Sequence, residues 1–125
     1  MANIKYFSPG TPVAGPYSPG VKVGNLIFVS GQGPTAGKMD IKEQTLSTLE
    51  NIKKILEAAG IEVSKIIKVS VFLKNIKDFG KMNRTYKKFF ETNGVTDKFP
   101  ARTTVEISNL PTAEMLIEID AIATI

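Results

Sequence analysis

Arg102 is the side chain in this sequence that is best suited to hold an anion. The chain has sixteen basic residues, and only two of them, Arg84 and Arg102, are arginines. Pro100 favours an extended backbone, and the β-branched residues that follow it predict a strand. A guanidinium at the start of that strand can bind a carboxylate or phosphate through two parallel hydrogen bonds, which lysine cannot reproduce. An ordinary surface arginine gives the same local pattern, so this segment leaves both interpretations open.

Two carboxylates, Glu118 and Asp120, interrupt the apolar C-terminal segment 114–125. Alternation along a strand places both of them on one face, together with Leu116 and Ile122. A face that mixes acids with large apolar residues suits an oligomer interface or a ligand cleft. A pair of acids that face solvent fits the alternation slightly better, so the pattern alone assigns neither acid a chemical role.

Asn83 is a polar residue that helical spacing places on an otherwise apolar stripe. It lies four residues after Phe79 and three before Tyr86, which puts the three side chains on one side of a helix. A buried amide without a partner costs ~1–3 kcal/mol, so Asn83 must be hydrogen-bonded. We favour a structural amide that ties the helix to a loop backbone over direct contact with a ligand.

Tyr17, Ser30 and Gly31 are further candidates for a site. Tyr17 stands in a stiff Gly-Pro-Tyr-Ser-Pro-Gly loop, where its simplest role is to pack over the edge of the domain. Ser30 and Gly31 end a predicted strand at a point where backbone amides can face a ligand. Gly31 could equally be present only for a turn.

The composition excludes several classes of chemistry. The 125 residues include no Cys, His or Trp. A Ser-His-Asp triad, a zinc held by His or Cys and an imidazole proton shuttle are therefore impossible. Chemistry must use carboxylates, lysine, tyrosine, hydroxyls, backbone groups or bound water, which disfavours a demanding hydrolysis and leaves an easy one open.

The charge and hydropathy patterns bear on partners and location. The formal net charge is +4, but the lysines are scattered and the only adjacent pairs are at 53–54 and 87–88. A solvated basic surface is therefore favoured over a nucleic-acid site. No apolar run approaches the ~20 residues of a membrane span, and the N-terminus lacks an apolar signal region. These patterns predict a cytoplasmic protein.

The chain is predicted to form a single α+β domain over residues 1–125, since its length suffices for one core and not for two. Strands are predicted at 4–7, 21–23, 26–30, 66–73, 102–107 and 114–125, and helices at 40–59 and 76–92. Gly31–Pro34 is expected to break the third strand. Because each helix has one apolar stripe to bury, we expect a mixed sheet of about six strands with both helices on one face.

The inward residues of strand 66–73 are predicted to be Ile67, Val69, Val71 and Leu73. Asn75 is the expected cap of the second helix, whose buried stripe is Phe79, Met82, Tyr86, Phe89 and Phe90.

Several short motifs follow one another in a specific order and spacing. They are Gly15-Pro16-Tyr17-Ser18, Gly24-Asn25, Ser30-Gly31-Gln32, Gln44-Thr45, Asn51, Leu56-Glu57-Ala58-Ala59-Gly60, Lys68-Val69-Ser70-Val71-Phe72-Leu73, Asp78-Phe79, Asn83 with Tyr86, Pro100-Ala101-Arg102, Leu110-Pro111, and Glu118 to Ala123. Together they cover essentially the whole chain and resemble the Rid family of small trimeric proteins (RidA, formerly YjgF), the 2-iminobutanoate/2-iminopropanoate deaminases.

The resemblance implies a chorismate-mutase-like subunit in a homotrimer, with three ligand clefts between neighbouring subunits. It implies that Arg102 holds the substrate carboxylate and that Tyr17, Ser30, Gly31 and Glu118 line the same cleft. Asn83 would support the wall of the cleft. Family members that lack this arginine are not expected to be deaminases.

Three departures from the family pattern limit this transfer. Pro19 stands where the family commonly has Gln, and the turn at 33–39 is shorter than usual. Both changes affect the expected mouth of the cleft and its substrate range. Thr104 occupies a position that is often Cys in close relatives, which suggests that the chemistry does not need a thiol.

The reaction implied by the resemblance is undemanding. Enamines such as 2-aminoacrylate tautomerise to 2-imino acids, which water already hydrolyses slowly. Arg102 would bind the carboxylate and Glu118 would hold and deprotonate the attacking water. The products would be a 2-oxo acid and ammonium, without a metal or organic cofactor.

Two other functions remain open from the sequence. A ribonuclease or translation inhibitor is an activity attached to some relatives, but the chain has no His pair, aromatic strand platform or basic cluster. A trimer that binds a 2-oxo acid or amino acid and regulates a partner would use the same Arg102 and the same cleft, so the sequence does not separate it from the deaminase.

Overall fold

The computed structural model describes residues 3–10 and 13–125. The strands are β1 (Ile4–Phe7), β2 (Gly20–Val23), β3 (Leu26–Gln32), β4 (Ile66–Leu73), β5 (Ala101–Glu106) and β6 (Ile117–Thr124). The helices are α1 (Ile41–Ala58) and α2 (Phe79–Thr92), with short 3₁₀ helices η1 (Val63–Lys65) and η2 (Ile76–Asp78). The predicted order of elements is confirmed.

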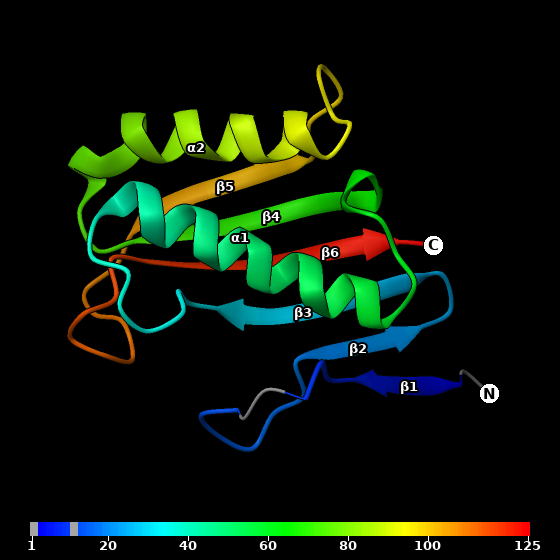
Figure 1. Ribbon diagram of the computed structural model, residues 1–125. Coiled ribbons are helices and arrows are strands. Elements are labelled where there is room, and N and C mark those ends of the chain that lie inside the picture. The colour runs from blue at the N-terminus through cyan, green and yellow to red at the C-terminus, as the bar shows by residue number, and fades with distance from the viewer. Residues whose placement is uncertain (1–2, 11–12) are drawn as a thin grey trace.

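The six strands form one sheet in the order β1-β2-β3-β6-β4-β5. β4 and β5 are parallel, and the other neighbours are antiparallel. Both helices lie side by side over one face of this sheet (Figure 1). The prediction of a mixed six-stranded sheet covered on one face by two helices is therefore correct. None of the described helices is long and apolar enough to cross a membrane.

The ends of α1 follow from local sequence. The Asp40 side chain accepts a hydrogen bond of 2.8 Å from the Glu43 amide, which satisfies one of the free N–H groups of the first turn. The helix ends before Gly60, whose φ of +71° is costly for other residues. Between these ends, Leu49, Ile52, Ile55 and Leu56 are buried against the sheet.

Strand β4 contains a bulge that the alternation did not predict. Ile66 pairs with Ala123 and Lys68 with Ile122, so Ile67 is an extra residue between two adjacent partners. Ile67 is 46% exposed, and Ile66 takes the core position instead. The predicted inward placement of Ile67 is therefore wrong, whereas Val69, Val71 and Leu73 are buried as predicted.

The second helical segment is divided. The Asn75 side chain accepts a hydrogen bond from the Lys77 amide and caps the 3₁₀ helix η2, and α2 begins only at Phe79. Phe79 is 42% exposed, so the predicted burial of this residue is wrong. Met82, Tyr86, Phe89 and Phe90 form the buried stripe as predicted.

The last strand is shorter than predicted, because β6 begins at Ile117. Leu116 precedes it and packs against the core, with its amide donating 2.7 Å to the Gln44 side chain. Leu116 therefore does not share the exposed face of β6 with Glu118, as the alternation suggested. Ile122 does lie on that face with Glu118 and Asp120.

Gln44 joins three segments from a buried position in α1. Its amide nitrogen donates to the carbonyls of Lys38 and Glu114 at 3.1 and 2.8 Å, and its oxygen accepts from Leu116. Thr48, also buried in α1, has no hydrogen-bond partner for its hydroxyl within the described residues. The two side chains can therefore be compared as a buried polar group with hydrogen-bond partners and a buried polar group without one.

Gln44→Leu should lower the free energy of unfolding by about 2–3 kcal/mol, because three backbone groups lose their partner. Thr48→Val should leave stability unchanged or raise it, because it removes a buried hydroxyl at nearly constant volume. Denaturant unfolding at a fixed protein concentration measures both. Equal losses in the two variants would show that the Gln44 contacts contribute little.

Candidate functional site

Arg102 is held by α2. In register it pairs with the buried Val69, so its side chain lies on the sheet face that the helices cover. Its Nη2 donates a 2.6 Å hydrogen bond to the Asn83 Oδ1, and its Nη1 lies 3.9 Å from the Met82 sulfur. Two aromatic rings flank the guanidinium, Tyr86 at 4.7 Å and Phe79 at 5.7 Å from ring centroid to Cζ. These contacts fix the orientation of the guanidinium, which an ordinary surface arginine would not have.

Asn83 is hydrogen-bonded as predicted, although its partner differs from the predicted one. The Asn83 oxygen binds the Arg102 side chain on β5 instead of a loop backbone. A hydrogen bond to a charged group contributes about 1.5–3 kcal/mol, more than one between neutral groups. Asn83 thus positions the arginine, and its half-buried side chain is accounted for by that contact.

The ring of Tyr86 packs against the Arg102 guanidinium. Burial raises the pKa of Tyr86 to about 12, although the nearby Arg102 charge works in the opposite direction. The phenol therefore stays neutral beside the guanidinium at physiological pH. The sequence identified Tyr86 and Phe79 only as core residues. Phe79 lies four residues before Asn83, and Tyr86 lies three residues after it. This helical spacing was the signal that all three side chains meet Arg102.

Glu118 lies on the opposite face of the sheet. The neighbouring residues Ile117 and Ile119 are fully buried under the helices, so alternation directs Glu118 to the uncovered face. Burial raises the pKa of Glu118, and the negative charge of Asp120 raises it further. The Glu118 carboxyl thus retains a proton to higher pH than an ordinary glutamate.

Gly31 leaves room for the Glu118 carboxylate. A Cβ atom at Gly31 would lie 2.5 Å from the Glu118 Oε2 and 2.9 Å from its carboxyl carbon. Gly31 is not among the glycines with positive φ and lies within β3, so the interpretation that it serves a turn is wrong. The prediction that the strand breaks at Gly31 is also wrong, because β3 continues to Gln32. Ser30 and Gly31 instead form a bulge opposite Asp120.

Ser30 connects this bulge to the loop that carries Tyr17. The Ser30 hydroxyl donates a 2.5 Å hydrogen bond to the Ser18 carbonyl, and its amide donates 2.9 Å to the Pro19 carbonyl. Tyr17 itself is 46% exposed, and its hydroxyl accepts a long hydrogen bond from the Ala14 amide. Pro19, one of the departures from the family pattern, is buried.

The candidate residues form two groups that one chain does not bring together. Arg102 and Asn83 lie between the sheet and α2, whereas Ser30, Gly31 and Glu118 lie at the uncovered face. That uncovered face also exposes apolar side chains, with Phe28 42% and Val105 39% exposed. Within the described residues, no cluster of acidic side chains is placed to hold a metal ion.

Known proteins resemble this chain over most of its length. The family described as Endoribonuclease L-PSP matches residues 9–125. A RutC family protein of Pyrococcus horikoshii is 49% identical over 115 residues, covering 87% of this chain and 86% of its own. An Escherichia coli protein named 2-iminobutanoate/2-iminopropanoate deaminase is 45% identical over 114 residues, covering 87% of each chain. The crystal structure of E. coli TdcF with bound serine superposes with a TM-score of 0.88 at 37% identity, covering 97% of this chain and 98% of TdcF.

Proposed function

The chain belongs to the Endoribonuclease L-PSP (YjgF/Rid) family, and on that premise we propose that it hydrolyses 2-imino acids to 2-oxo acids and ammonium. The substrates are 2-iminopropanoate and 2-iminobutanoate, which arise from enamines such as 2-aminoacrylate. The observation that carries the proposal is the fixed fork of Arg102, held by Asn83 at 2.6 Å and by the Tyr86 ring. A preoriented guanidinium suits a small carboxylate whose reacting carbon must stay in one place.

The complete site takes residues from two copies of the chain. Arg102 of one copy binds the carboxylate, and Glu118 of a neighbouring copy supplies the acid-base group from its uncovered face. Such a contact uses different surfaces on its two sides, and its repetition forms a ring when the rotation between copies closes. A homotrimer with three equivalent sites is the ring we propose. The exposed Phe28 and Val105 side chains support it, because burial of the uncovered face would remove them from water.

Glu118 acts as the general base in this scheme. It takes a proton from a water molecule as the water oxygen bonds to the imine carbon and the C=N electrons pass to nitrogen. Glu118 returns this proton to the nitrogen, which gives a carbon that bears one hydroxyl and one amino group. Glu118 then transfers the hydroxyl proton to the amino group as the C–N bond breaks, which releases ammonia and leaves a C=O bond. The raised pKa of Glu118 brings its basicity closer to the operating pH. Exposed Tyr17 and the bulge at Ser30 and Gly31 complete the hydrogen-bonding frame. No step needs a metal or an organic cofactor.

A metabolite-binding protein is the second candidate function. The observation in its favour is that the solved structure of the relative TdcF contains serine, a small molecule with a carboxylate. A protein that only binds such ligands would use Arg102 in the same way and would not need Glu118 as a base. The family is named for an endoribonuclease, so cleavage of RNA is measured alongside.

One set of assays separates these functions. Wild-type protein is mixed with 2-iminopropanoate generated in situ, and the release of ammonia and pyruvate is followed against the uncatalysed rate. Binding of pyruvate and degradation of RNA are measured on the same preparation. Accelerated ammonia release supports the deaminase. Pyruvate binding without acceleration supports the binding protein, and RNA cleavage alone would contradict both.

The protein should be a stable trimer in solution. Light scattering at micromolar concentration should give about three times the chain mass of 13.6 kDa. Phe28→Glu should lower that mass, because it places a charge in the proposed interface. A monomer over the whole concentration range would remove the site between copies from consideration.

A further inference from the structure

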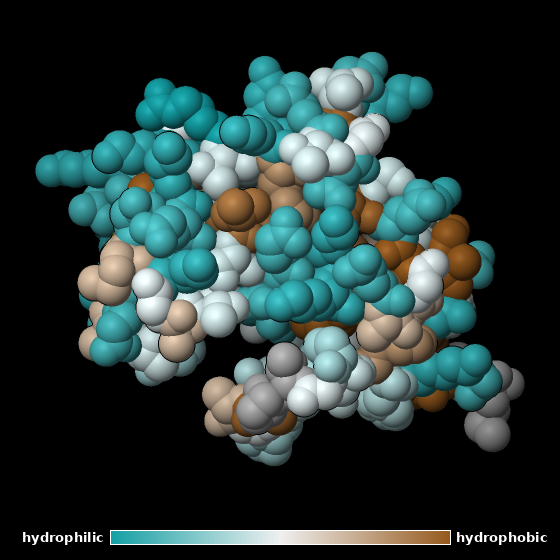
Figure 2. All heavy atoms as spheres, in the orientation of Figure 1, coloured by the Kyte–Doolittle hydropathy of each residue, from teal (hydrophilic) through white to brown (hydrophobic). Residues whose placement is uncertain are grey.

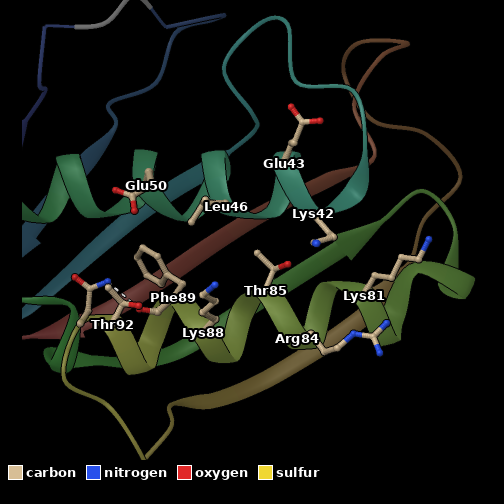
Figure 3. A pocket seen from close by; sticks show the side chains of 11 residues that line it. Lys42, Glu43, Leu46, Glu50, Lys81, Arg84, Thr85, Lys88, Phe89 and Thr92 are labelled. Atoms are coloured by element: carbon tan, nitrogen blue, oxygen red, sulfur yellow. Dashed lines mark hydrogen bonds between the residues drawn. The ribbon is translucent and has the colours of Figure 1, made fainter.

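The outer surface of the helical layer contains a groove that the proposed reaction does not use. It runs between α1 and α2 and has a volume of about 820 Å³. Arg102 contacts α2 from the sheet side, whereas this groove opens on the solvent side of the helices (Figure 3). The groove therefore stays accessible in any assembly formed through the uncovered face of the sheet.

The floor of the groove is apolar. Leu46 of α1 and Phe89 of α2 extend into the space between the helices (Figure 3). Leu46 is 46% exposed and lies in the second turn of α1. Figure 2 shows a small hydrophobic patch between the two helices within a mainly hydrophilic face. An apolar side chain from a ligand can cover Leu46 and gain the free energy of burying it.

The rim of the groove carries an excess of positive charge. Four cationic side chains line it, and two carboxylates oppose them, which gives a net charge of +2. The cations are Lys42, Lys81, Arg84 and Lys88, and the carboxylates are Glu43 and Glu50. Lys42, Lys81 and Arg84 gather at one end of the groove, where Glu43 is the one carboxylate, and Glu50 lies toward the other end (Figure 3). The groove thus has a positive end and complements a ligand that is acidic at one end.

Arg84 distinguishes this rim from a lysine-rich solvated surface. It is one of only two arginines among sixteen basic residues, and the other, Arg102, holds the proposed substrate carboxylate. Arginine presents a planar fork that matches a carboxylate and is less strongly hydrated than lysine. It is therefore the cation best suited to anchor an acidic side chain at an interface.

The shape of the groove favours a peptide over a small molecule. Its walls are the flanks of two helices, whose backbone groups are already hydrogen-bonded within the helices. Only side chains are left to contact a ligand, and they follow the helices for about three turns, or ~15 Å. A helix of about 10 residues has that length and presents apolar residues at i, i+3 and i+4 beside its charges.

We propose that the groove between α1 and α2 docks a short amphipathic helix of a partner protein. Its apolar stripe covers the exposed Leu46, which lies beside the buried Phe89, and its acidic end lies against Lys42, Lys81 and Arg84. This inference does not depend on the proposed deaminase activity, since none of its residues belongs to the candidate site.

A displayed library of helical peptides of about 12 residues tests the proposal, with the intact wild-type protein as bait. Enriched peptides are labelled with a fluorophore, and their binding is measured by anisotropy. Peptides with acidic residues at one end and an apolar stripe should be enriched. Arg84→Glu and Leu46→Ala should each weaken their binding at least tenfold, whereas Lys54→Glu should change it less than twofold. Lys54 is the matched control, because it is exposed on α1 and does not line the groove.

Several results would overturn the proposal. The first is that no acidic peptides are enriched, and the second is that wild type and Arg84→Glu bind the enriched peptides equally well. The third is that Lys54→Glu weakens binding as much as Arg84→Glu does, which would indicate a general attraction to a basic protein. Binding of an RNA oligonucleotide or anionic vesicles that Arg84→Glu abolishes, without peptide enrichment, would assign the surface to another partner. Circular dichroism and the solution mass confirm that the variants are folded. Ammonia release measured on Arg84→Glu should equal that of wild type, so failure here is distinguishable from failure of the proposed reaction.

Discussion

Arg102→Lys should lower kcat/KM for hydrolysis of 2-iminopropanoate by about 100-fold or more. Lysine keeps the positive charge but loses the planar fork that Asn83 and the Tyr86 ring hold in place. The carboxylate would then bind in several orientations, and the imine carbon would no longer lie at a fixed distance from the water. Ammonia release and the dissociation constant for pyruvate measure the two parts of this effect.

Arg84→Lys is the matched control for this substitution. It makes the same chemical change at the other arginine of the chain, on the solvent side of α2. Its deaminase activity should equal that of wild type. Near-normal activity in Arg102→Lys would show that the charge suffices and that the bidentate contact is wrong.

Glu118→Gln should lower the rate of imine hydrolysis by a factor of ~10²–10⁴ with little change in the affinity for pyruvate. The amide keeps the size of the side chain beside Gly31 but cannot accept a proton from water. Single-turnover ammonia release and pyruvate titration measure the two quantities. Wild-type activity in this variant, with tight pyruvate binding, would show that Glu118 is not the base and that backbone-held water suffices for hydrolysis. It would also favour the binding protein.

The same carboxyl links activity to pH and to stability. Because the pKa of Glu118 is raised in the folded state, the rate should fall as the pH drops through that raised value and the base becomes protonated. The folded state binds this proton more tightly than the unfolded state, so the Glu118 contribution to stability is lost as the pH rises through the raised pKa. Glu118→Gln should therefore be more stable than wild type at neutral pH. The difference should vanish below the ordinary pKa of 4.5, where the carboxyl is protonated in both states.

Asp120→Asn is the control for the acid-base role. Asp120 lies on the same strand face and raises the pKa of Glu118 through its charge. Its removal should shift the acidic limb of the pH-rate profile to lower pH and leave the rate at neutral pH within a few-fold of wild type. A loss as large as that in Glu118→Gln would assign the base to Asp120 or to the pair.

The sequence predicted the elements and their layers because each depends on local patterns. The Asp40 cap, the helix end before Gly60 and the apolar stripe of α1 each involve residues that are close to one another in sequence. The error at Ile67 arose because the pairing of strands determines the position of that residue, and the error at Phe79 arose because the second helical segment is divided into η2 and α2. Ile67 is exposed by a bulge against β6, and a regular alternation contains no sign of such an extra residue.

The sequence named the candidate residues but did not predict how they are placed relative to one another. The resemblance grouped Arg102 with Glu118, but their faces depend on the registers of β5 with β4 and of β6 with its neighbours. These registers place the two side chains on opposite faces of one sheet. The contact of Arg102 with Asn83, and the space that Gly31 leaves for Glu118, likewise depend on pairs of elements distant in sequence.

Subunit mixing tests most directly the central claim that each site takes Arg102 from one copy and Glu118 from another. Arg102→Lys and Glu118→Gln chains, each nearly inactive alone, are mixed in equal amounts, unfolded and refolded, and mixed assemblies are verified by native mass spectrometry. In random ring-shaped assemblies, about a quarter of the contacts between copies join an intact Arg102 to an intact Glu118. We therefore predict that about a quarter of wild-type deaminase activity returns. Mixed assemblies that remain as inactive as the two separate variants would contradict a site shared between subunits.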